Sequence, residues 1–501
     1  MVKGYIRAMF SRQTNVTYPN GVDTMFRRTK IMATLGPATD PTEVREEMIT
    51  AGLDVIRINF SHGDLAEHQS RIEKMRACAQ AHGRHIGVLA DLQGPKIRIG
   101  RFADGPVTLE NGSAFALDTT LSSVGGHRQA IGVDYKQLAE DVSPGDILLL
   151  DDGRIELEVT GVVDGRVDCL VVTGGLLSDN KGINRKGGGL SADALTEKDR
   201  TDIRAAAGMA VDFIAVSFVR SAADIHEARR VLAAAGGTAG IIAKIERAEA
   251  VAAIEEIIQA ADGVMVARGD LGVEIGDAEV PAIQKRIIKR AIWLDKPVIT
   301  ATQMMESMIE NPIPTRAEVS DVANAVLDGT DAIMLSGETA VGRYPVKVVA
   351  AATRACLAAE KQPATQTSGH RVERRFRRVD EAVSMSAMYA ANHLAIKVIV
   401  ALTESGSTPL LMSRINTAIP IFGLSRHETS LGKMTLYRNV HPYQFDVTEY
   451  APEAIKRAAI QTLEKQELLE FGDLVIITKG DHDGVVGVTN SMKIVEVGQV
   501  V

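Results

Sequence analysis

The stretch GVMVARGDLGVEIG (263–276) begins as an apolar run and then changes, without a turn dipeptide, into Arg268, Gly269 and Asp270. An apolar run of this kind is typical of a strand that is covered on both faces of a parallel sheet. The charged residues that follow therefore lie at the C-terminal end of a buried strand. In parallel α/β barrels this is the end where ligand-binding residues gather. The stretch predicts a parallel α/β fold with a functional site at the strand ends.

The same pattern recurs along the chain from about residue 29. Periodic, helix-like segments such as SAADIHEARRVLAAAGG (221–237) and RAEAVAAIEEIIQAAD (247–262) separate most of the strand candidates. Strands that alternate with helices in this way predict a TIM (β/α)8 barrel, built from residues 25–94 and 191–360. The eight strand candidates are TKIMATLG (29–36), DVIRINFS (54–61), HIGVLADL (85–92), DFIAVSFV (212–219), GIIAKIE (240–246), GVMVARGD (263–270), KPVITAT (296–302) and DAIMLSGE (331–338).

Three regions fall outside the predicted barrel. Residues 95–190 are rich in Val, Leu, Gly and Asp and carry turn pairs such as Asn111-Gly112, which predicts an inserted, small β-barrel-like lid domain. Residues 363–501 return to an α/β pattern and predict a C-terminal open-sheet domain. Residues 1–24 are polar and lack the apolar core of a signal peptide, so we expect an N-terminal extension, with Met25 as an alternative start.

Composition and charge exclude several classes of protein. The chain has 501 residues, 45% of them hydrophobic and 24% charged, which is typical of a globular protein of about two or three domains. A net charge of −8 gives no electrostatic basis for binding nucleic acid or an anionic membrane. No run approaches the roughly 20 apolar residues that span a bilayer. Three cysteines without a CxxC pair argue against zinc and disulfides and for a reducing compartment, so we expect a cytoplasmic protein.

Polar side chains interrupt the apolar strand candidates near their C-terminal ends. Side chains alternate between the two faces of a strand, so residues two positions apart lie on the same face. Because the ends of parallel barrel strands meet at one mouth, we expect all of these side chains to converge there. The set comprises Arg57, Asn59 and Ser61; Asp91; Lys244 and Glu246; Arg268 and Asp270; Thr300 and Thr302; and Ser336 and Glu338.

Each member of this set also has a structural interpretation. Arg268 with Asp270, or Lys244 with Glu246, could form a buried ion pair and nothing more, since interior charges need partners. Thr302 alone could be a core residue bonded to a carbonyl, and Arg-Gly-Asp is also an adhesion tripeptide on exposed loops of secreted proteins. Independent ion pairs have no reason to fall at the same end of several strands. Convergence therefore favours a functional site.

The side chains in the set point to a metal ion and a phosphoryl group. Glu246 and Asp270 supply oxygen ligands on neighbouring strands, which suits Mg²⁺ or Mn²⁺ rather than zinc. The cations Arg57, Lys244 and Arg98 suit a phosphoryl group, whose negative charge must be held while it moves. The sequence has neither GxxxxGKS nor GxxxxGKT, which excludes a P-loop.

Six stretches together resemble the pyruvate kinase family, in order and from about Thr29 to the C-terminus. Within them the blocks TRAE (315–318) and SGET (336–339) are highly specific. The resemblance implies transfer of the phosphoryl group of phosphoenolpyruvate to ADP, then protonation of the enolate to pyruvate, as a step of glycolysis. The stretches are TKIMATLGPATD (29–40), IRINFSHG (56–63), DLQGPKIRIG (91–100), AKIERAEAV (243–251), MVARGDLGVEIG (265–276) and ITATQMMESMIENPIPTRAEVSDVANAVLDGTDAIMLSGETAVGRYP (299–345).

The resemblance also implies roles for individual residues. Glu246 and Asp270 would hold Mg²⁺ or Mn²⁺, and Lys244 would lie against the moving phosphoryl group. The backbone N–H groups of Gly269 and Asp270, with the Thr302 hydroxyl, would hold the substrate carboxylate. Thr302 and a nearby water would also be placed to deliver the proton to the enolate carbon.

On the nucleotide side, the resemblance implies that Arg57 bridges both phosphates and that ADP or ATP is held by Asn59, His62, Arg98 and Lys181. Lys181 belongs to the inserted domain, which would close as a lid and exclude water. A rival function is another metal-dependent barrel that acts on phosphoenolpyruvate or pyruvate, such as an aldolase or a carboxyl-transfer enzyme. Such an enzyme would have no need of the lid or of Lys181.

One position departs from the family pattern. Family members that need K⁺ usually carry a glutamate in the stretch that matches GPKIRIG (94–100), where this chain has Lys96. A tethered ammonium at or near the monovalent-cation position would supply the missing charge. We therefore expect no requirement for K⁺, with Asn59, Ser61 and Asp91 as structural polar groups around Lys96.

The C-terminal domain carries TESGSTPLLMSRI (403–415) after a strand and before a helix. Hydroxyl and N–H groups there can hold a phosphate, although an ordinary helix N-cap explains the same residues equally well. The resemblance favours an allosteric pocket for a sugar phosphate or a nucleotide monophosphate, completed by the loop at 479–490, in a homotetramer. The residues assigned to the effector phosphate are Thr403, Ser405, Gly406, Ser407 and Thr408.

Overall fold

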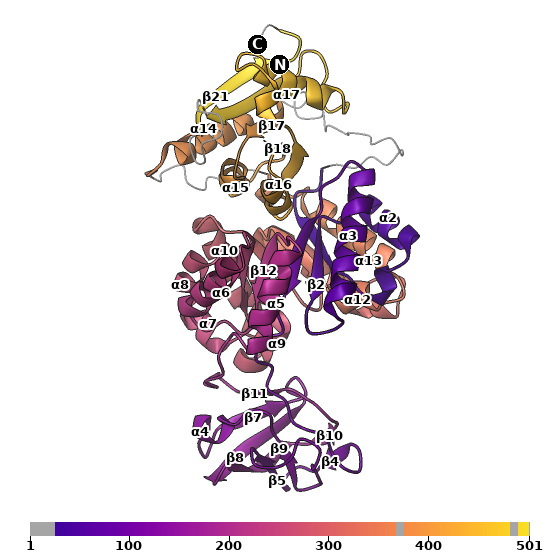
Figure 1. Ribbon diagram of the computed structural model, residues 1–501, viewed down its shortest axis with the longest axis vertical. Helices are drawn as coiled ribbons and strands as arrows, with labels where there is room; N and C mark the ends of the chain where they lie inside the picture. The colour runs from indigo at the N-terminus through magenta and orange to yellow at the C-terminus, as the bar shows by residue number, and fades with distance from the viewer. Residues whose placement is uncertain (1–25, 367–374, 481–488, 500–501) are drawn as a thin grey trace, which may run out of the picture. The chain divides into compact units, whose positions relative to one another are not determined.

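The computed structural model describes residues 26–366, 375–480 and 489–499 (Figure 1). The expected N-terminal extension at 1–24 and most of the effector loop expected at 479–490 lie outside the described residues. Across the ranges described, no helix combines the length and the apolar character that crossing a membrane requires.

Eight strands close into a barrel in the order β1-β16-β15-β14-β13-β12-β3-β2. Every strand predicted for the barrel is present, so the TIM-barrel prediction is confirmed. Nearly all strand residues are buried, as expected for strands covered on both faces, and this is why apolar runs identified them. The strands are β1 (Lys30–Thr34), β2 (Val55–Asn59), β3 (Gly87–Asp91), β12 (Phe213–Val216), β13 (Gly240–Ile245), β14 (Gly263–Ala267), β15 (Val298–Ala301) and β16 (Ala332–Leu335).

Helices follow the barrel strands, and capping residues in the sequence mark where some of them begin and end. Thr196 begins α5 (Glu197–Gly208) through a capping box with Asp199. Gly329 ends α11 (Arg316–Asp328) in the left-handed conformation, at φ 97°. The other helices of this part are α2 (Thr42–Thr50), α3 (Leu65–Ala81), α6 (Ala222–Ala234), α7 (Ala248–Ala252), α8 (Ile254–Ala260), α9 (Arg268–Ile275), α10 (Val280–Trp293), α12 (Gly337–Ala340) and α13 (Pro345–Ala359).

The segment between β3 and α5 forms two sheets with a core of their own. Six strands pair in the order β11-β7-β8-β9-β5-β6, and β10 pairs with β4. Residues 97–100 bridge the two edges of the larger sheet: Ile183 donates to the carbonyl of Ile97 at 3.0 Å beside β11, and Gly100 donates to that of Gly132 at 2.8 Å in β6, which agrees with a barrel-like insert. Its core includes the buried side chains of Phe115, Leu117 and Leu157. The elements are β4 (Val107–Leu109), β5 (Ala114–Asp118), β6 (Ala130–Gly132), α4 (Leu138–Asp141), β7 (Ile147–Leu150), β8 (Ile155–Val163), β9 (Arg166–Thr173), β10 (Gly175–Leu177) and β11 (Ile183–Arg185).

The C-terminal strands form a five-stranded open sheet in the order β19-β18-β17-β20-β21, in which only β21 is antiparallel to its neighbour. β19 (Val440–Gln444) escapes prediction because His441 and Pro442 break its apolar pattern; proline is tolerated on an edge strand. The strand order reverses at β17, which makes the C-terminal end of β17 the topological switch point. The remaining elements are α14 (Val379–His393), β17 (Ile396–Leu402), α15 (Ser407–Ser413), β18 (Ile421–Ser425), α16 (Glu428–Met434), α17 (Ile455–Glu464), β20 (Leu474–Gly480) and β21 (Thr489–Glu496).

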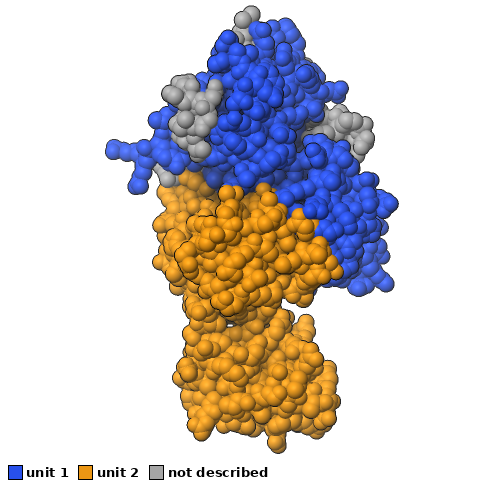
Figure 2. All heavy atoms as spheres, viewed as in Figure 1, with its two compact units in different colours: residues 1–56, 70–88, 304–501 blue, residues 57–69, 89–303 orange. Residues whose placement is uncertain are grey.

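Internal contacts divide the chain into two compact units (Figure 2). The first comprises residues 1–56, 70–88 and 304–501, and the second comprises residues 57–69 and 89–303. Every residue assigned above to substrate, metal, monovalent cation or nucleotide belongs to the second unit. The effector residues at 403–408 belong to the first.

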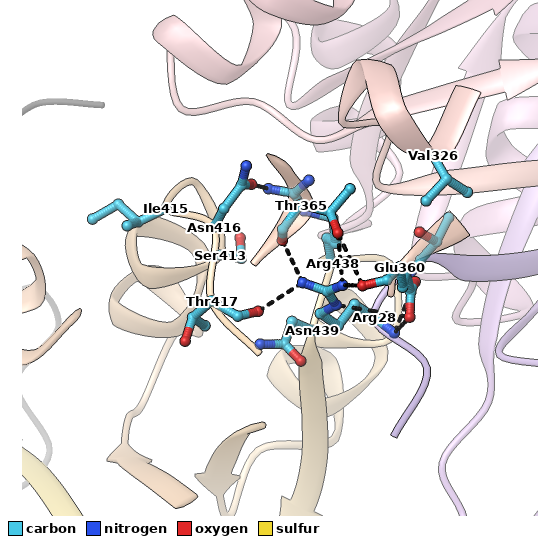
Figure 3. Close-up of a pocket in the computed structure, with 11 residues that line it drawn as sticks. Arg28, Val326, Glu360, Thr365, Ser413, Ile415, Asn416, Thr417, Arg438 and Asn439 are labelled. Carbon is cyan, nitrogen blue, oxygen red and sulfur yellow. Dashed lines mark hydrogen bonds and ion pairs between the residues drawn. The ribbon is translucent and has the colours of Figure 1, made fainter. Parts of the chain in front are cut away.

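A buried polar network in the first unit joins barrel residues to the C-terminal sheet. Arg414 pairs with Asp331, and both side chains are almost fully buried. Arg28 donates from Nη1 to the carbonyl of Thr417 at 3.0 Å and from Nη2 to the hydroxyl of Thr365 at 2.9 Å. Figure 3 shows these bonds of Arg28 beside a small cavity with room for about one water molecule. Most polar groups that line this cavity already have hydrogen-bond partners, and its volume is too small for a metabolite. We therefore interpret the surrounding network as structural.

Candidate active site

Lys244, near the end of β13, lies at the centre of a cluster of polar side chains in the second unit. Its ammonium donates to Ser217 Oγ at 2.7 Å and lies 3.0 Å from Glu246 Oε1 and 3.2 Å from Asp91 Oδ1. Burial by itself would lower the pKa of Lys244, but the charges of Asp91 and Glu246 outweigh it and raise the pKa above its ordinary value. Lys244 is therefore a fixed cation at neutral pH.

Asp91, at the end of β3, holds a second cation. Its Oδ2 accepts from Nε of Arg57 at 2.7 Å, and Nη2 of Arg57 lies 2.7 Å from the same oxygen in an ion pair. Burial would raise the pKa of Asp91, but Lys244 and Arg57 outweigh it and lower the pKa. The structure thus brings together Arg57, Asp91 and Lys244, three residues that the strand-end argument predicted to converge.

Glu246 and Asp270 form the acidic side of the cluster. Glu246 is 2% exposed, and its Oε2 accepts the backbone N–H of Phe218 at 2.8 Å. Burial raises the pKa of Glu246; Lys244 opposes this, and the nearby charge of Asp270 adds to it. The two carboxylates therefore repel each other and lack full compensation within the protein.

The donor set fits a hard divalent cation. Three carboxylates (Asp91, Glu246, Asp270) face two cations (Arg57, Lys244), so the fully ionised cluster carries one net negative charge. Among the described residues no group of three or more His, Cys, Asp or Glu side chains is arranged to hold an ion. Mg²⁺ commonly uses only one or two protein carboxylates and fills its other positions with water and substrate oxygens. Glu246 and Asp270 could hold such an ion between them, whereas a closed, zinc-type site is absent from this part of the chain.

The strand ends differ from prediction at β14. The strand stops at Ala267, and Arg268 and Asp270 lie in the first turn of α9. The prediction that they share one face of a strand is wrong, because the backbone turns helical one residue before Gly269. A short helix, α9, follows the strand directly. Arg268 donates to the carbonyls of Ala301 and Thr302.

Thr302 also lies outside its predicted strand, since β15 stops at Ala301. Its hydroxyl accepts the N–H of Gly269 at 3.0 Å and donates to the carbonyl of Ala301 at 2.7 Å. Thr302 has φ 64° and Gln303 has φ 53°. Such left-handed conformations cost on the order of 1–3 kcal/mol each for non-glycine residues. The resemblance implies that Thr302 and Gly269 both hold the substrate carboxylate, and the structure places these two residues in contact.

The four residues assigned to the nucleotide form two pairs. In the inserted segment, Ile99 donates to the carbonyl of Lys181 at 2.9 Å and Arg98 donates to that of Asn180 at 2.8 Å, so Arg98 and Lys181 lie on neighbouring segments. Lys181 pairs with Asp151 at 2.6 Å. After β2, the N–H of His62 donates to the carbonyl of Asn59 at 3.2 Å. No bond joins one pair to the other within the described residues.

The residues assigned to the monovalent-cation position are dispersed among other partners. Asn59 Oδ1 accepts the N–H of Ser61 at 3.1 Å, and Asp91 is held by Arg57 and Lys244. Lys96 lines a small cavity together with Asp270 and Glu274. The role of Lys96 stays a prediction.

Several site residues were missed by sequence reasoning. Ser217 and Phe218, which contact Lys244 and Glu246, directly follow β12. The strand-end rule applied to the fourth strand candidate would have found Ser217. Glu274 in α9 is 3% exposed, and burial raises its pKa to about 7. Nothing in the sequence distinguishes it from a surface glutamate.

In the first unit, Glu338 and the effector residues have local partners. Glu338 follows β16 and accepts the N–H groups of Ser336 at 2.9 Å and Met305 at 3.4 Å, so its carboxylate serves the backbone. Between β17 and α15, Thr403 Oγ1 accepts from Gly406 N at 3.0 Å, and Ser405 Oγ lies 3.2 Å from Ser407 Oγ. Thr408 is buried, and its hydroxyl bonds that of Thr489 at 2.7 Å.

Comparison with known proteins identifies the family of the chain. Residues 26–349 match the family model "Pyruvate kinase, barrel domain" and residues 381–495 match "Pyruvate kinase, alpha/beta domain". Pyruvate kinase II of Salmonella typhimurium is 54% identical over 475 residues, covering 94% of this chain and 99% of the relative. Pyruvate kinase of Haemophilus influenzae is 54% identical over 458 residues, which cover 91% of this chain and 96% of the relative. Pyruvate kinase of Mycobacterium tuberculosis is 42% identical over 475 residues, which cover 95% of this chain and 99% of the relative. The chain belongs to the pyruvate kinase family.

Proposed function

We propose that this chain transfers the phosphoryl group of phosphoenolpyruvate to ADP, giving pyruvate and ATP in glycolysis. The observation that carries the proposal is the Lys244 ammonium, held in the cluster by Asp91, Glu246 and Ser217. A positioned cation is what a loose phosphoryl-transfer transition state needs, because charge spreads over the moving group.

Glu246 and Asp270 would hold the divalent metal that the family requires, Mg²⁺ or Mn²⁺. When bound, the ion would neutralise phosphoryl and enolate oxygens. Lys244 would lie against the transferring phosphoryl group, and Arg57 would exchange its bonds with Asp91 for phosphate oxygens of both substrates. Their positions are supported by the shared carboxylate of Asp91, which keeps both cations in place before substrate arrives.

The first turn of α9 and the end of β15 would hold the carboxylate of the substrate. The N–H groups of Gly269 and Asp270 and the hydroxyl of Thr302 are the proposed donors. The bond between Gly269 and Thr302 supports their proximity, and the substrate carboxylate would take over these donors from their present acceptors. The same hydroxyl, with a water, would deliver the proton to the enolate carbon. Asn59, His62, Arg98 and Lys181 would hold the nucleotide, with the inserted domain (95–190) as the lid.

Lys96 would replace the monovalent cation, so the enzyme would need no K⁺. In the C-terminal domain, residues 403–408 would bind the phosphate of an allosteric sugar phosphate or nucleotide monophosphate. The topological switch point at β17 supports this, because ligands of open α/β sheets bind outside such strand ends. The family further suggests that the chain forms a homotetramer in the cytoplasm. It also suggests a catalytic barrel of residues 25–94 and 191–360 and a regulatory domain of residues 363–501.

A coupled assay tests the main proposal. Purified protein with phosphoenolpyruvate, ADP and Mg²⁺ should form ATP and pyruvate in equal amounts. A metal-dependent aldolase or carboxyl-transfer enzyme would consume phosphoenolpyruvate or pyruvate without making ATP from ADP. Activation by a panel of sugar phosphates and nucleotide monophosphates, lost in S407E, would support the effector pocket; activation that persists in S407E would contradict it.

A further inference from the structure

Two consecutive residues after β15 have backbone conformations that non-glycine residues seldom adopt. Thr302 has φ 64° and Gln303 has φ 53°. For a β-branched threonine a positive φ is a genuine outlier. Strain of this kind persists only where the surrounding structure holds it, and it gathers at functional sites. Some nearby group must therefore hold the turn at 301–303.

Arg268 is that group. Its Nε donates to the carbonyl of Ala301 at 3.0 Å, and its Nη2 donates to the carbonyl of Thr302 at 2.6 Å. A guanidinium is planar and presents its donors in a fixed fork, so one side chain can hold two successive carbonyls. Its charge makes each bond stronger than one from a neutral donor.

The same turn is tied to the residue that follows Arg268. Gly269 N–H donates to Thr302 Oγ1 at 3.0 Å, and that hydroxyl donates to the Ala301 carbonyl at 2.7 Å. The Ala301 carbonyl thus accepts from both Arg268 and Thr302. Without the bond from Arg268, the Ala301 carbonyl would lose one of its two donors. Both the turn at 301–303 and the orientation of the Thr302 hydroxyl would then be less constrained.

We propose that Arg268 is a positioning residue for the reaction: it binds the carbonyls of Ala301 and Thr302 and so holds the Thr302 side chain at the position from which its oxygen would contact the substrate. The inference rests on the proposed function, because Arg268 has this task only if Thr302 contacts the substrate. Arg268 acts through Thr302 and touches no reacting atom itself. It also explains why an arginine follows a buried strand directly in the stretch at 263–276.

The first test is R268K, which keeps the positive charge but lacks the rigid fork in which two separate nitrogens each bind one carbonyl. We expect kcat per folded site to fall about 10- to 100-fold, with the KM values for phosphoenolpyruvate and ADP within about threefold of wild type. The matched control is R229K, since Arg229 also donates to a carbonyl, that of Ala260, at 2.9 Å and pairs with Asp262 at 2.9 Å. R229K should leave kcat within about twofold. An R268K enzyme that behaves like R229K would overturn the proposal.

A double-mutant cycle separates positioning from a structural role. If Arg268 acts through the Thr302 hydroxyl, adding R268K to T302A should lower kcat by less than about twofold further. Losses that multiply in the double variant would overturn the proposal.

The variant Q303G tests whether the activity lost in R268K can be restored. It also keeps the proposal testable if R268K folds poorly. Glycine adopts positive φ without steric strain, so R268K/Q303G should regain part of the lost kcat while Q303G alone stays near wild type. Absence of any regain, or failure of R268K/Q303G to fold, would identify Arg268 as structural and overturn the proposal. A wild-type enzyme that forms no ATP from phosphoenolpyruvate and ADP would instead overturn the proposed function.

Discussion

The ammonium of Lys244 lies 3.2 Å from the carboxylate of Asp91, which is 1% exposed. The same carboxylate accepts a hydrogen bond from Nε of Arg57 and forms an ion pair with Nη2 of Arg57, each at 2.7 Å. One buried anion thus holds two cations that would otherwise repel each other. Because these side chains come from β2, β3 and β13, the barrel itself fixes the arrangement. Charges fixed in this way need no reorganisation when a phosphoryl group arrives.

Replacing Asp91 by asparagine should weaken both the fold and the activity. The change leaves Arg57 and Lys244 close together with one fewer anion, and breaking a buried ion pair typically costs about 3–5 kcal/mol. We expect kcat to fall about tenfold or more as the cations move apart. Urea unfolding and the coupled assay measure the two effects. D168N, in the exposed Arg166–Asp168 pair at 2.8 Å, is the control and should change stability by less than about 0.5 kcal/mol. A D91N protein as stable as D168N would contradict the interpretation.

Mg²⁺ should stabilise the wild-type protein but not E246Q. Burial and the charge of Asp270 raise the pKa of Glu246, so a neutral side chain is tolerated there in the absence of metal. Without metal we expect E246Q to melt at or above the temperature of the wild type. Mg²⁺ at about 100 times its dissociation constant should add about 2.7 kcal/mol to the wild type, and little to E246Q. E255Q, which alters an exposed partner of Arg290, should keep the full response. An equal Mg²⁺ response in E246Q and wild type would remove Glu246 from the metal site.

The barrel was predictable because its strands are covered on both faces, which leaves an apolar run in the sequence for each. The convergence of Arg57, Asp91 and Lys244 followed from the direction of parallel strands alone. The end of β14 was not predictable, since Arg268 and Gly269 fit a strand or a helix, and their contacts with Ala301 and Thr302 are distant in sequence. The burial of Glu274 escaped for a similar reason: it depends on segments near Asn184 and Ala248 that are distant in sequence.

Glu274 should make stability depend on pH near neutrality. Its carboxylate accepts from Ala248 N at 2.9 Å, with Arg247 4.0 Å away, yet burial dominates and raises its pKa from 4.5 to about 7. The folded state therefore binds more protons than the unfolded state between these values, and stability falls as pH rises through this window. E274Q, neutral at every pH, should melt higher than wild type at pH 8 and converge with it toward pH 5.

The control for this pH effect is E318Q. Burial would raise the pKa of Glu318, but hydrogen bonds from Ser307 and Thr315 outweigh it and lower the pKa, so its charge stabilises the fold above its unfolded pKa. E318Q should therefore melt below wild type at pH 8, opposite in sign to E274Q. Melting curves of the three proteins from pH 5 to pH 8 decide the matter. A lower melting temperature for E274Q at pH 8 would show that the carboxylate is ionised and stabilising.

Reversing the charge at Lys96 should create a requirement for K⁺. Lys96 shares a small cavity with Asp270 and Glu274, so K96E replaces a cation beside two acids with a third acid. A monovalent cation then has to supply the charge that the ammonium gave. In sodium-free, tetramethylammonium-buffered assays we expect KCl to raise the kcat of K96E about tenfold or more and to leave wild type nearly unchanged. K96M, which removes the charge without adding an acid, should lose activity with a weaker response to KCl. A wild-type enzyme activated many-fold by KCl would show that Lys96 does not replace the ion.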